Sequence, residues 1–150
     1  RMYQQVILDH AKMRHGAGTI DDAQGQSFQV NPTCGDQVLL KVRLAADGHT
    51  IEQIAWDGQG CSISQASLSL MTDLTTGLTV GEAEELGELF REMMHSRGDF
   101  AEEKADRLED ASALIGVSRF SARVKCALLG WMALRGALTE ALAATPKEDQ

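Results

Sequence analysis

The fold is decided by one stretch of the chain, Gln37–Trp56, which reads QVLLKVRLAADGHTIEQIAW. From Val38 to Leu44 every second residue is apolar, and this period of two is typical of a strand with one well-buried face. Asp47-Gly48 then gives a good hairpin-turn signal, and a second run, Ile51–Trp56, follows it. The stretch therefore predicts two antiparallel strands joined by a tight turn.

The residues before this hairpin predict a further strand and a helix. Phe28 and Val30 can supply a third strand beside the pair. Residues 16–25 are rich in Gly, Asp and Gln and are expected to form a loop. Tyr3–Met13 has Val, Ile, His and Ala at helical spacing, which predicts a short N-terminal helix.

After the hairpin the sequence pattern becomes helical. A helix is expected to begin just after the Gly58-Gln59-Gly60 turn, where Ser62 and Gln65 have the spacing of a capping box. Val80–Met94 predicts a second helix, and residues 120–143 predict a long third one. The apolar stripe of this last helix consists of Val124, Leu128, Trp131, Leu138 and Leu142.

The order of these elements is helix, strands and then helices, which indicates an α+β fold. Residues 96–109 are charged and irregular, so a loop with one short helical turn is expected there. The whole chain, residues 1–150, is long enough to form a single domain with its own core. The acidic tail from about residue 145 is expected to fray.

Composition and charge exclude several classes of function. The net charge of -8 argues against binding to a phosphate backbone, because nucleic-acid surfaces of proteins are basic. No uninterrupted apolar run approaches the roughly 20 residues that span a bilayer, and no secretory leader is evident, so we expect a cytoplasmic protein without a membrane partner. The 3 cysteines cannot all pair within one chain. In a reducing compartment they are metal ligands, nucleophiles or buried apolar residues.

Three cysteines and one aspartate form a candidate metal site. Cys34 and Asp36 are two residues apart, so in extended chain their side chains point to one side, and Gly35 between them permits a tight backbone. Cys61 precedes a helix start, where the helix dipole favours the thiolate. Cys126 lies on the long helix, and the small residues Gly130, Ala133 and Ala137 follow it along one line. Three thiolates and a carboxylate suit tetrahedral Zn²⁺.

Other readings of the same residues remain open. A single cysteine is more often a small buried apolar residue than a ligand. Zinc with four anionic ligands carries a net negative charge, and Arg123, three residues before Cys126 on nearly the same helix face, can offset it or pair with Asp36. Taken alone, Arg123 is interpreted as a charged side chain exposed to solvent on the surface of the helix. The four histidines are expected to be structural or exposed, since His10 and His15 share no clean helical face.

Three segments together resemble the SufU branch of the IscU/NifU-like iron–sulfur cluster assembly family. They are Asn31-Pro32-Thr33-Cys34-Gly35-Asp36, Asp57-Gly58-Gln59-Gly60-Cys61-Ser62-Ile63-Ser64 and Arg123-Val124-Lys125-Cys126. The resemblance extends from Tyr3 to the end of the long helix. It implies an α+β fold in which a small antiparallel sheet of about three strands packs against several helices, with a zinc site at one end.

The same resemblance implies roles for individual residues. It makes Cys34, Asp36, Cys61 and Cys126 the zinc ligands. It makes Cys34 the thiol that accepts persulfide sulfur from a SufS-type cysteine desulfurase and relays it to the SUF cluster-assembly machinery. The desulfurase is a pyridoxal-phosphate enzyme and is expected to be a homodimer. The chain would then be a sulfurtransferase-type acceptor that activates its partner. On docking, a partner side chain such as a histidine would replace Cys34 as ligand and free it to react.

The sequence departs from IscU-type scaffolds at two places. Those scaffolds carry a histidine directly before the third cysteine, where this chain has Lys125. They also carry a Leu-Pro-Pro-Val-Lys motif that a chaperone recognises, whereas this chain has no proline between Pro32 and Pro146. A sulfur relay is therefore favoured over a scaffold that assembles a [2Fe–2S] cluster on the same ligands. A structural zinc module that mediates protein contacts is the alternative from another class, and iron is the alternative metal at the site.

Overall fold

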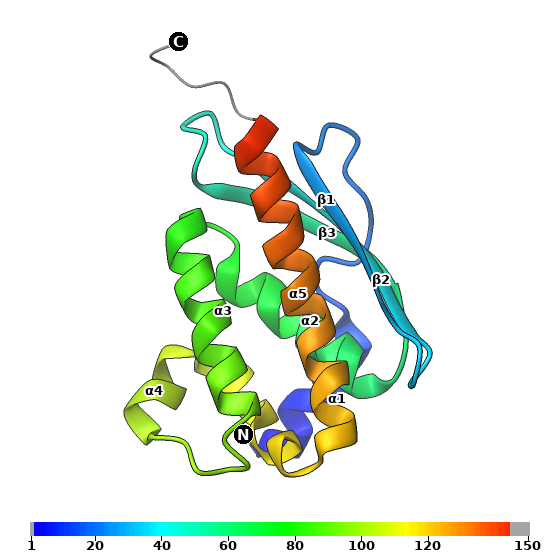
Figure 1. The fold of residues 1–150 in the computed structure, drawn as a ribbon, viewed down its shortest axis with the longest axis vertical. Helices are drawn as coiled ribbons and strands as arrows, with labels where there is room; N and C mark the ends of the chain where they lie inside the picture. Colours follow the sequence, from blue (N-terminus) through cyan, green and yellow to red (C-terminus); the bar gives the residue numbers. More distant parts are fainter. Residues whose placement is uncertain (1, 145–150) are drawn as a thin grey trace.

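The structure, a computed structural model, describes residues 2–144 and confirms the α+β architecture. Three strands form one sheet, and the helices gather on one side of it (Figure 1). In chain order the elements are α1 (Tyr3–Met13), β1 (Gly25–Asn31), β2 (Asp36–Leu44), β3 (Ile51–Gln59), α2 (Ser62–Thr75), α3 (Val80–Met94), α4 (Glu102–Arg107), the 3-10 helix η1 (Glu109–Arg119) and α5 (Ser121–Ala144).

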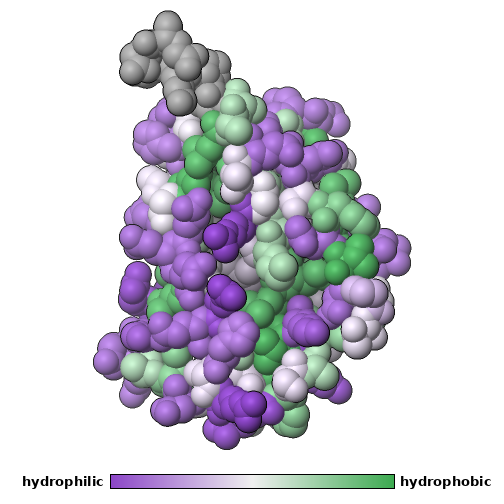
Figure 2. Space-filling view, in the orientation of Figure 1, coloured by the Kyte–Doolittle hydropathy of each residue, from purple (hydrophilic) through white to green (hydrophobic). Residues whose placement is uncertain are grey.

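The sheet is antiparallel throughout, with the strand order β1-β2-β3. Every second residue of β2 from Asp36 to Leu44 is buried against the helices, as the alternation in the sequence predicts. The other face of the sheet is open, and the apolar side chains of Phe28 and Val30 are exposed on it, opposite Leu39 and Gln37 in the register. In Figure 2 hydrophilic side chains dominate over α3 and α4, whereas apolar ones gather on the side of the strands.

Small residues allow α5 to lie directly on the sheet. The helix-facing positions at the start of β1 are Gly25 and Ser27, and a Cβ added at Gly25 would lie 2.0 Å from the carbonyl oxygen of Ala137. Nearer the start of α5, a Cβ added at Gly130 would lie 2.5 Å from Leu68 Cδ2 of α2. Neighbouring elements thus approach the predicted line of small residues closely, β1 at Ala137 and α2 at Gly130.

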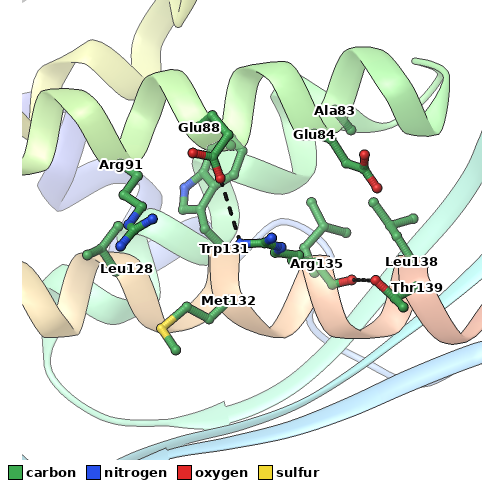
Figure 3. Close-up of a pocket in the computed structure, with 12 residues that line it drawn as sticks. Ala83, Glu84, Glu88, Arg91, Leu128, Trp131, Met132, Arg135, Leu138 and Thr139 are labelled. Atoms are coloured by element: carbon green, nitrogen blue, oxygen red, sulfur yellow. Dashed lines mark hydrogen bonds and ion pairs between the residues drawn. The ribbon is translucent and has the colours of Figure 1, made fainter.

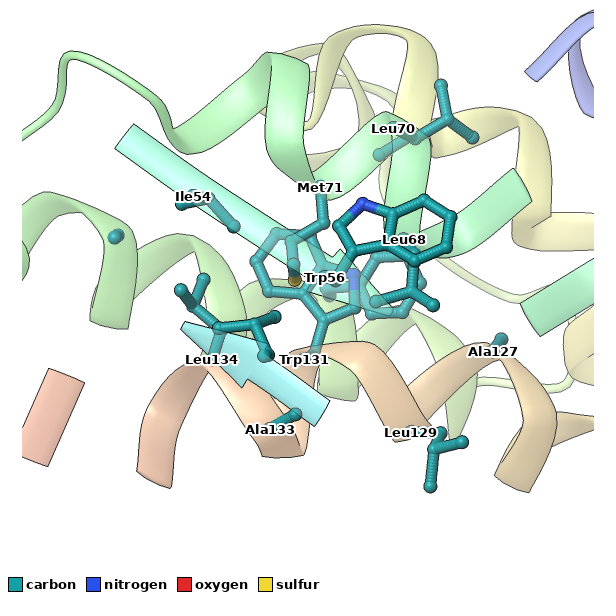
Figure 4. Packing of buried hydrophobic residues seen from close by; sticks show 14 of the residues in the cluster. Ile54, Trp56, Leu68, Leu70, Met71, Ala127, Leu129, Trp131, Ala133 and Leu134 are labelled. Atoms are coloured by element: carbon teal, nitrogen blue, oxygen red, sulfur yellow. The ribbon is translucent and has the colours of Figure 1, made fainter. Parts of the chain in front are cut away.

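The core lies between the sheet and the helices and is rich in aromatic and aliphatic side chains (Figure 4). Trp56 of β3 and Leu68 of α2 are almost completely buried in it. Phe90 of α3 stacks on Trp131 of α5, with ring centroids 4.8 Å apart and planes 18° from parallel. This core fixes α5, which carries Cys126, and α2, which begins directly after Cys61, relative to the sheet.

The helix α5 is long and apolar enough to cross a membrane by length and composition alone. However, 56% of its most apolar window is buried inside the protein. That burial, against β1, β2 and α2, is the pattern of a central core helix. No second helix of this kind occurs among residues 2–144.

The structure corrects several details of the sequence-based expectations. Gly58 and Gln59 do not form a turn, because β3 continues to Gln59 and pairs with β2. Ser62 is not a helix cap: Cys61 is the N-cap of α2, without a side-chain capping bond. The capping box occurs instead at Thr79 and Glu82, at the start of α3.

The region between α3 and α5 is more ordered than its irregular sequence suggests. It contains α4, which matches the expected short helical turn, and η1, which the sequence did not predict and which buries Leu114 and Val117. In the apolar stripe expected on α5, Leu128 is only half-buried and Leu142 is exposed. The acidic tail expected to fray lies outside the described residues.

Candidate metal centre

Four elements bring the candidate ligands to one end of the sheet. Cys34 lies in the turn between β1 and β2, which lies near the first turns of α2 and α5 in Figure 1. The turn is closed by backbone hydrogen bonds from Cys34 N and Gly35 N to the carbonyl oxygen of Asn31, and Gly35 has a φ of 73° that a glycine adopts without strain. Asp36 follows as the first residue of β2 and is completely buried.

Three of the four predicted ligands, Cys34, Asp36 and Cys126, lie close together. Cys126 Sγ lies 3.3 Å from Cys34 Sγ, although the two residues are 92 positions apart in the chain. The donor atoms of Cys34, Asp36 and Cys126 all lie within 4.8 Å of one another, which makes this group able to hold a metal ion. Cys61 lies at the edge of the group, with its Sγ 3.9 Å from Asp36 Oδ2.

Asp36 is held in place by the start of α2. The backbone N–H of Cys61 donates a hydrogen bond of 3.0 Å to Asp36 Oδ1, so the carboxylate occupies the N-terminal end of a helix, where negative charge is favoured. Gly60 makes this possible: it has a φ of 155°, and a Cβ there would lie 2.2 Å from Asp36 Oδ1. The backbone can therefore approach the carboxylate this closely only with glycine at position 60.

The three thiols differ in their exposure to solvent. All are free; Cys34 is exposed, Cys61 is half-buried and Cys126 is buried. Burial raises the pKa of the Cys126 thiol above its ordinary value, and the neighbouring Asp36, Cys34 and Cys61 raise it further. A metal ion bound there must displace the proton of Cys126, because the thiolate is the form that coordinates.

The donor set fits a tetrahedral zinc ion. Zinc–thiolate bonds of about 2.3 Å place two sulfur ligands on the order of 3.8 Å apart, so the 3.3 Å separation of Cys34 Sγ and Cys126 Sγ would have to widen slightly to hold the ion. Among residues 2–144, the buried side-chain amide nitrogens Asn31 Nδ2 and Gln65 Nε2 have no hydrogen-bond partner. Asn31 faces Asp36 across the β1–β2 ladder, and Gln65 lies one helical turn after Cys61. Amide N–H groups at such positions can offset the negative charge of a thiolate-rich site.

Arg123, expected to offset the charge of this site, does not contact it in this structure. Its side chain is exposed, and no ion pair joins it to Asp36 within residues 2–144. The carboxylate is satisfied by the backbone of Cys61 instead. The role of Arg123 stays a prediction about the metal-loaded or partner-bound protein.

A separate groove runs between α3 and α5, away from the thiols (Figure 3). It encloses about 280 Å³ and is lined by Trp131, Leu134 and Leu138, with Glu88 and Arg135 in an ion pair at its rim. The lining residues include no thiol and no histidine, so the groove has no direct part in the chemistry of the candidate metal centre.

Comparison with known proteins identifies relatives that match nearly the whole chain. The family model described as the NifU-like N-terminal domain matches residues 2–139. The zinc-dependent sulfurtransferase SufU of Bacillus subtilis is 41% identical over 133 residues, which cover 89% of this chain and 86% of the relative. The iron–sulfur cluster assembly scaffold protein IscU of Streptococcus pyogenes is 38% identical over 149 residues, covering 99% of this chain and 90% of that protein.

Solved structures have the same fold. A protein from Fervidobacterium islandicum described as an iron–sulfur cluster assembly scaffold for the SUF system superposes with a TM-score of 0.77 at 31% identity, covering 89% of this chain and 94% of that chain. The N-terminal part of a NifU-like protein from Brucella abortus superposes with a TM-score of 0.83 at 20% identity, covering 96% of each chain. The second likeness confirms the fold alone.

Proposed function

This chain belongs to the NifU-like N-terminal domain family, which includes the SufU and IscU proteins, and from that premise we propose that it is a zinc-dependent sulfur acceptor of iron–sulfur cluster assembly. It takes persulfide sulfur from a SufS-type cysteine desulfurase onto Cys34 and passes it to the SUF machinery in the cytoplasm. The desulfurase, a homodimer, carries the pyridoxal phosphate and performs the cleavage of cysteine.

One observation carries the proposal: the exposed thiol of the candidate metal centre is Cys34, and it lies in a turn rather than in a helix or strand. A ligand in such a turn can leave the group with little disturbance of the core. Cys126 and Asp36, in contrast, are fixed within α5 and β2 and buried. The relative named as a zinc-dependent sulfurtransferase supports zinc as the ion. We propose Cys34, Asp36, Cys61 and Cys126 as its ligands.

Zinc bound by these residues would keep the thiols deprotonated and in position. In the transfer step, docking of the desulfurase would free the Cys34 thiolate, and a histidine of the partner would be a suitable ligand in its place. The Cys34 thiolate attacks the terminal sulfur of the partner's persulfide. A new sulfur–sulfur bond forms on Cys34, the old one breaks, and the partner's cysteine leaves as a thiolate, so there is no net oxidation.

The test measures sulfur transfer from a purified SufS-type desulfurase supplied with ³⁵S-cysteine. We expect the wild-type chain to acquire labelled persulfide and to stimulate cysteine turnover, and Cys34→Ala to do neither. Thr33→Ala is the matched control, because it alters an exposed residue of the same turn and removes no thiol. Full stimulation by Cys34→Ala would overturn the proposal, and turnover unaffected by the wild-type chain would favour a structural zinc module.

A scaffold that assembles a [2Fe–2S] cluster on the same ligands is the second candidate, supported by the IscU relative at 38% identity. Lys125, which stands where IscU-type scaffolds have a histidine, favours the sulfur acceptor. Anaerobic reconstitution with iron and sulfide followed by visible absorption separates the two candidates. A stable cluster that transfers to an apoprotein would support the scaffold.

A further inference from the structure

A second group of metal-binding side chains lies at the opposite end of α2 from the candidate metal centre. His10 and His15 meet Asp73 there, and one ring nitrogen of each histidine and a carboxylate oxygen of Asp73 lie within 4.8 Å of one another. Asp73 is twelve residues after Cys61, which at 1.5 Å per residue places the two groups about 18 Å apart along the helix. The group is therefore distinct from the thiols.

The backbone explains how two histidines without a common helical face come together. α1 ends at Met13, and Arg14 adopts a left-handed conformation with a φ of 47°, which turns the chain back toward α2. The loop then runs so close to α2 that a Cβ added at Gly16 would lie 2.8 Å from Thr72. This reversal places the imidazole of His15 beside that of His10, with ring centroids 5.3 Å apart.

Both histidines are held in place before any ion binds. The backbone N–H of His15 donates to Ser69 Oγ at 2.9 Å, and its carbonyl oxygen accepts from Trp56 Nε1 at 2.8 Å. The buried imidazole of His10 lies with Nδ1 2.8 Å from the same Ser69 Oγ. Fixing a histidine ring through one of its nitrogens is how proteins orient imidazole ligands of metals.

The third donor is already in contact with the second imidazole. Asp73 Oδ2 lies 2.7 Å from His15 Nδ1, and both side chains are nearly half exposed to solvent. A cavity of about 180 Å³ adjoins His10 and Asp73 and is also lined by Glu109 and Asp110. The surroundings of the group are thus acidic and open enough for water molecules to complete the coordination of a cation.

An ordinary surface ion pair does not account for this arrangement. His49 and Asp47 form such a pair in the β2–β3 turn, with Nε2 and Oδ2 3.7 Å apart, and no further histidine or cysteine joins them in any metal-binding group of the described chain. Beside the pair of His15 and Asp73, in contrast, lies a second imidazole, the buried side chain of His10. Two imidazoles and one carboxylate form a donor set typical of transition-metal ions.

We propose that His10, His15 and Asp73 form a second metal site, which binds a borderline divalent ion such as Zn²⁺, Co²⁺ or Ni²⁺ with water as the remaining ligands. Thiol-preferring and oxygen-preferring ions are disfavoured by the mixed nitrogen and oxygen donors. An ion there would fasten the loop after α1 to the C-terminal part of α2. The site is independent of sulfur transfer at Cys34.

Cobalt is the probe that separates this site from the thiols. The full chain is first loaded with one equivalent of Zn²⁺, and Co²⁺ is then titrated with bound metal measured by elemental analysis after dialysis. We expect one further equivalent of cobalt, without the near-ultraviolet absorption of cobalt–thiolate bonds, and with selective broadening of the His10 and His15 ring signals in NMR spectra. Cobalt–thiolate absorption, or no second equivalent, would overturn the proposal.

Variants assign the ligands. His15→Ala and Asp73→Asn alter residues that are nearly half exposed, so they spare the core, and each should weaken cobalt binding at least about 10-fold. His49→Ala is the matched control, since it breaks a histidine–aspartate pair outside the group and should leave binding unchanged. Circular dichroism checks that each variant folds. Equal cobalt affinity in all three variants and the wild type would contradict the assignment.

Discussion

At the scale of single residues, the candidate metal centre depends on groups that are not themselves ligands. Gly60 has no side chain and thereby leaves room for the carboxylate of Asp36. The N–H of Cys61 then orients that carboxylate toward the thiols. The three cysteines make the sulfur ligands evident in the sequence, whereas the position of Asp36 depends on the backbone around Gly60.

Gly60→Ala is predicted to weaken zinc binding at least about 10-fold, because the new methyl group displaces Asp36. A chromophoric chelator in competition with the protein measures the affinity. Gly18→Ala is the matched control: Gly18 has a similar φ of 147° but no atom within 4 Å of an added Cβ, so it shares the backbone strain and lacks the clash. Equal zinc affinities in the two variants would rule out this role for Gly60.

At the scale of elements, the turn between β2 and β3 is stabilised by one carboxylate. Asp47 accepts hydrogen bonds from the Thr50 hydroxyl group and from the backbone N–H groups of His49 and Thr50. These bonds lower the pKa of Asp47 from 3.8 to about 2, and the bond from the Thr50 side chain has the largest effect. The ionised form of Asp47 is therefore the one that favours the folded hairpin.

The hairpin should consequently lose stability in acid. Because the pKa is lower in the folded chain, the contribution of Asp47 is complete above pH 3.8 and disappears as the pH falls toward 2. Asp47→Asn should have a lower melting temperature than the wild type at pH 6, and the difference should close between pH 4 and pH 2. Asp21→Asn, in the loop before β1, is the control. A pH-independent difference for Asp47→Asn would contradict this account.

The helix starts show why a local signal can mislead. Ser62 and Gln65 have capping-box spacing, yet the box forms at Thr79 and Glu82, where both reciprocal hydrogen bonds are present. The extension of β3 to Gln59 moves the N-cap of α2 to Cys61. The pairing of β3 with β2, a long-range interaction, therefore decides where the helix begins.

At the scale of the whole molecule, the close approach of α5 to β1 holds the candidate metal centre together. Cys34 belongs to the turn after β1, and Cys126 belongs to the first half of α5. The spacing of these two elements is set by Gly25 against Ala137 and by Ser27 against Gly136. A change in this packing is therefore expected to alter the separation of the two elements that position Cys34 and Cys126.

Gly25→Ala is predicted to destabilise the protein by about 1–3 kcal/mol, because its Cβ would meet the backbone of α5, which cannot move aside as a side chain can. Urea unfolding followed by circular dichroism measures the loss in free energy of unfolding. Gly116→Ala in η1 is the control, since an added Cβ there meets nothing within 4 Å. Equal stabilities of the two variants would show that the packing of β1 on α5 tolerates the methyl group.

Much of the fold could be predicted from local patterns. The alternation from Val38 to Leu44, the Asp47-Gly48 turn and the limits of Tyr3–Met13 and Val80–Met94 are confirmed, because each depends on residues close together in the chain. The 3-10 helix η1 was missed because its sequence has no clear period. Its residues become ordered only through packing against α1, α2, α3 and α5.

The sequence by itself determined the chemical donors, three thiols and one carboxylate, and most of the strands and helices around them. Only the tertiary structure decided which donors meet. Cys34 and Cys126 come within 3.3 Å because small residues let α5 lie on the sheet, while Arg123 stays in solvent. His10, His15 and Asp73 converge because a left-handed residue reverses the chain after α1. Contacts between residues far apart in sequence depend on packing, which no local pattern encodes.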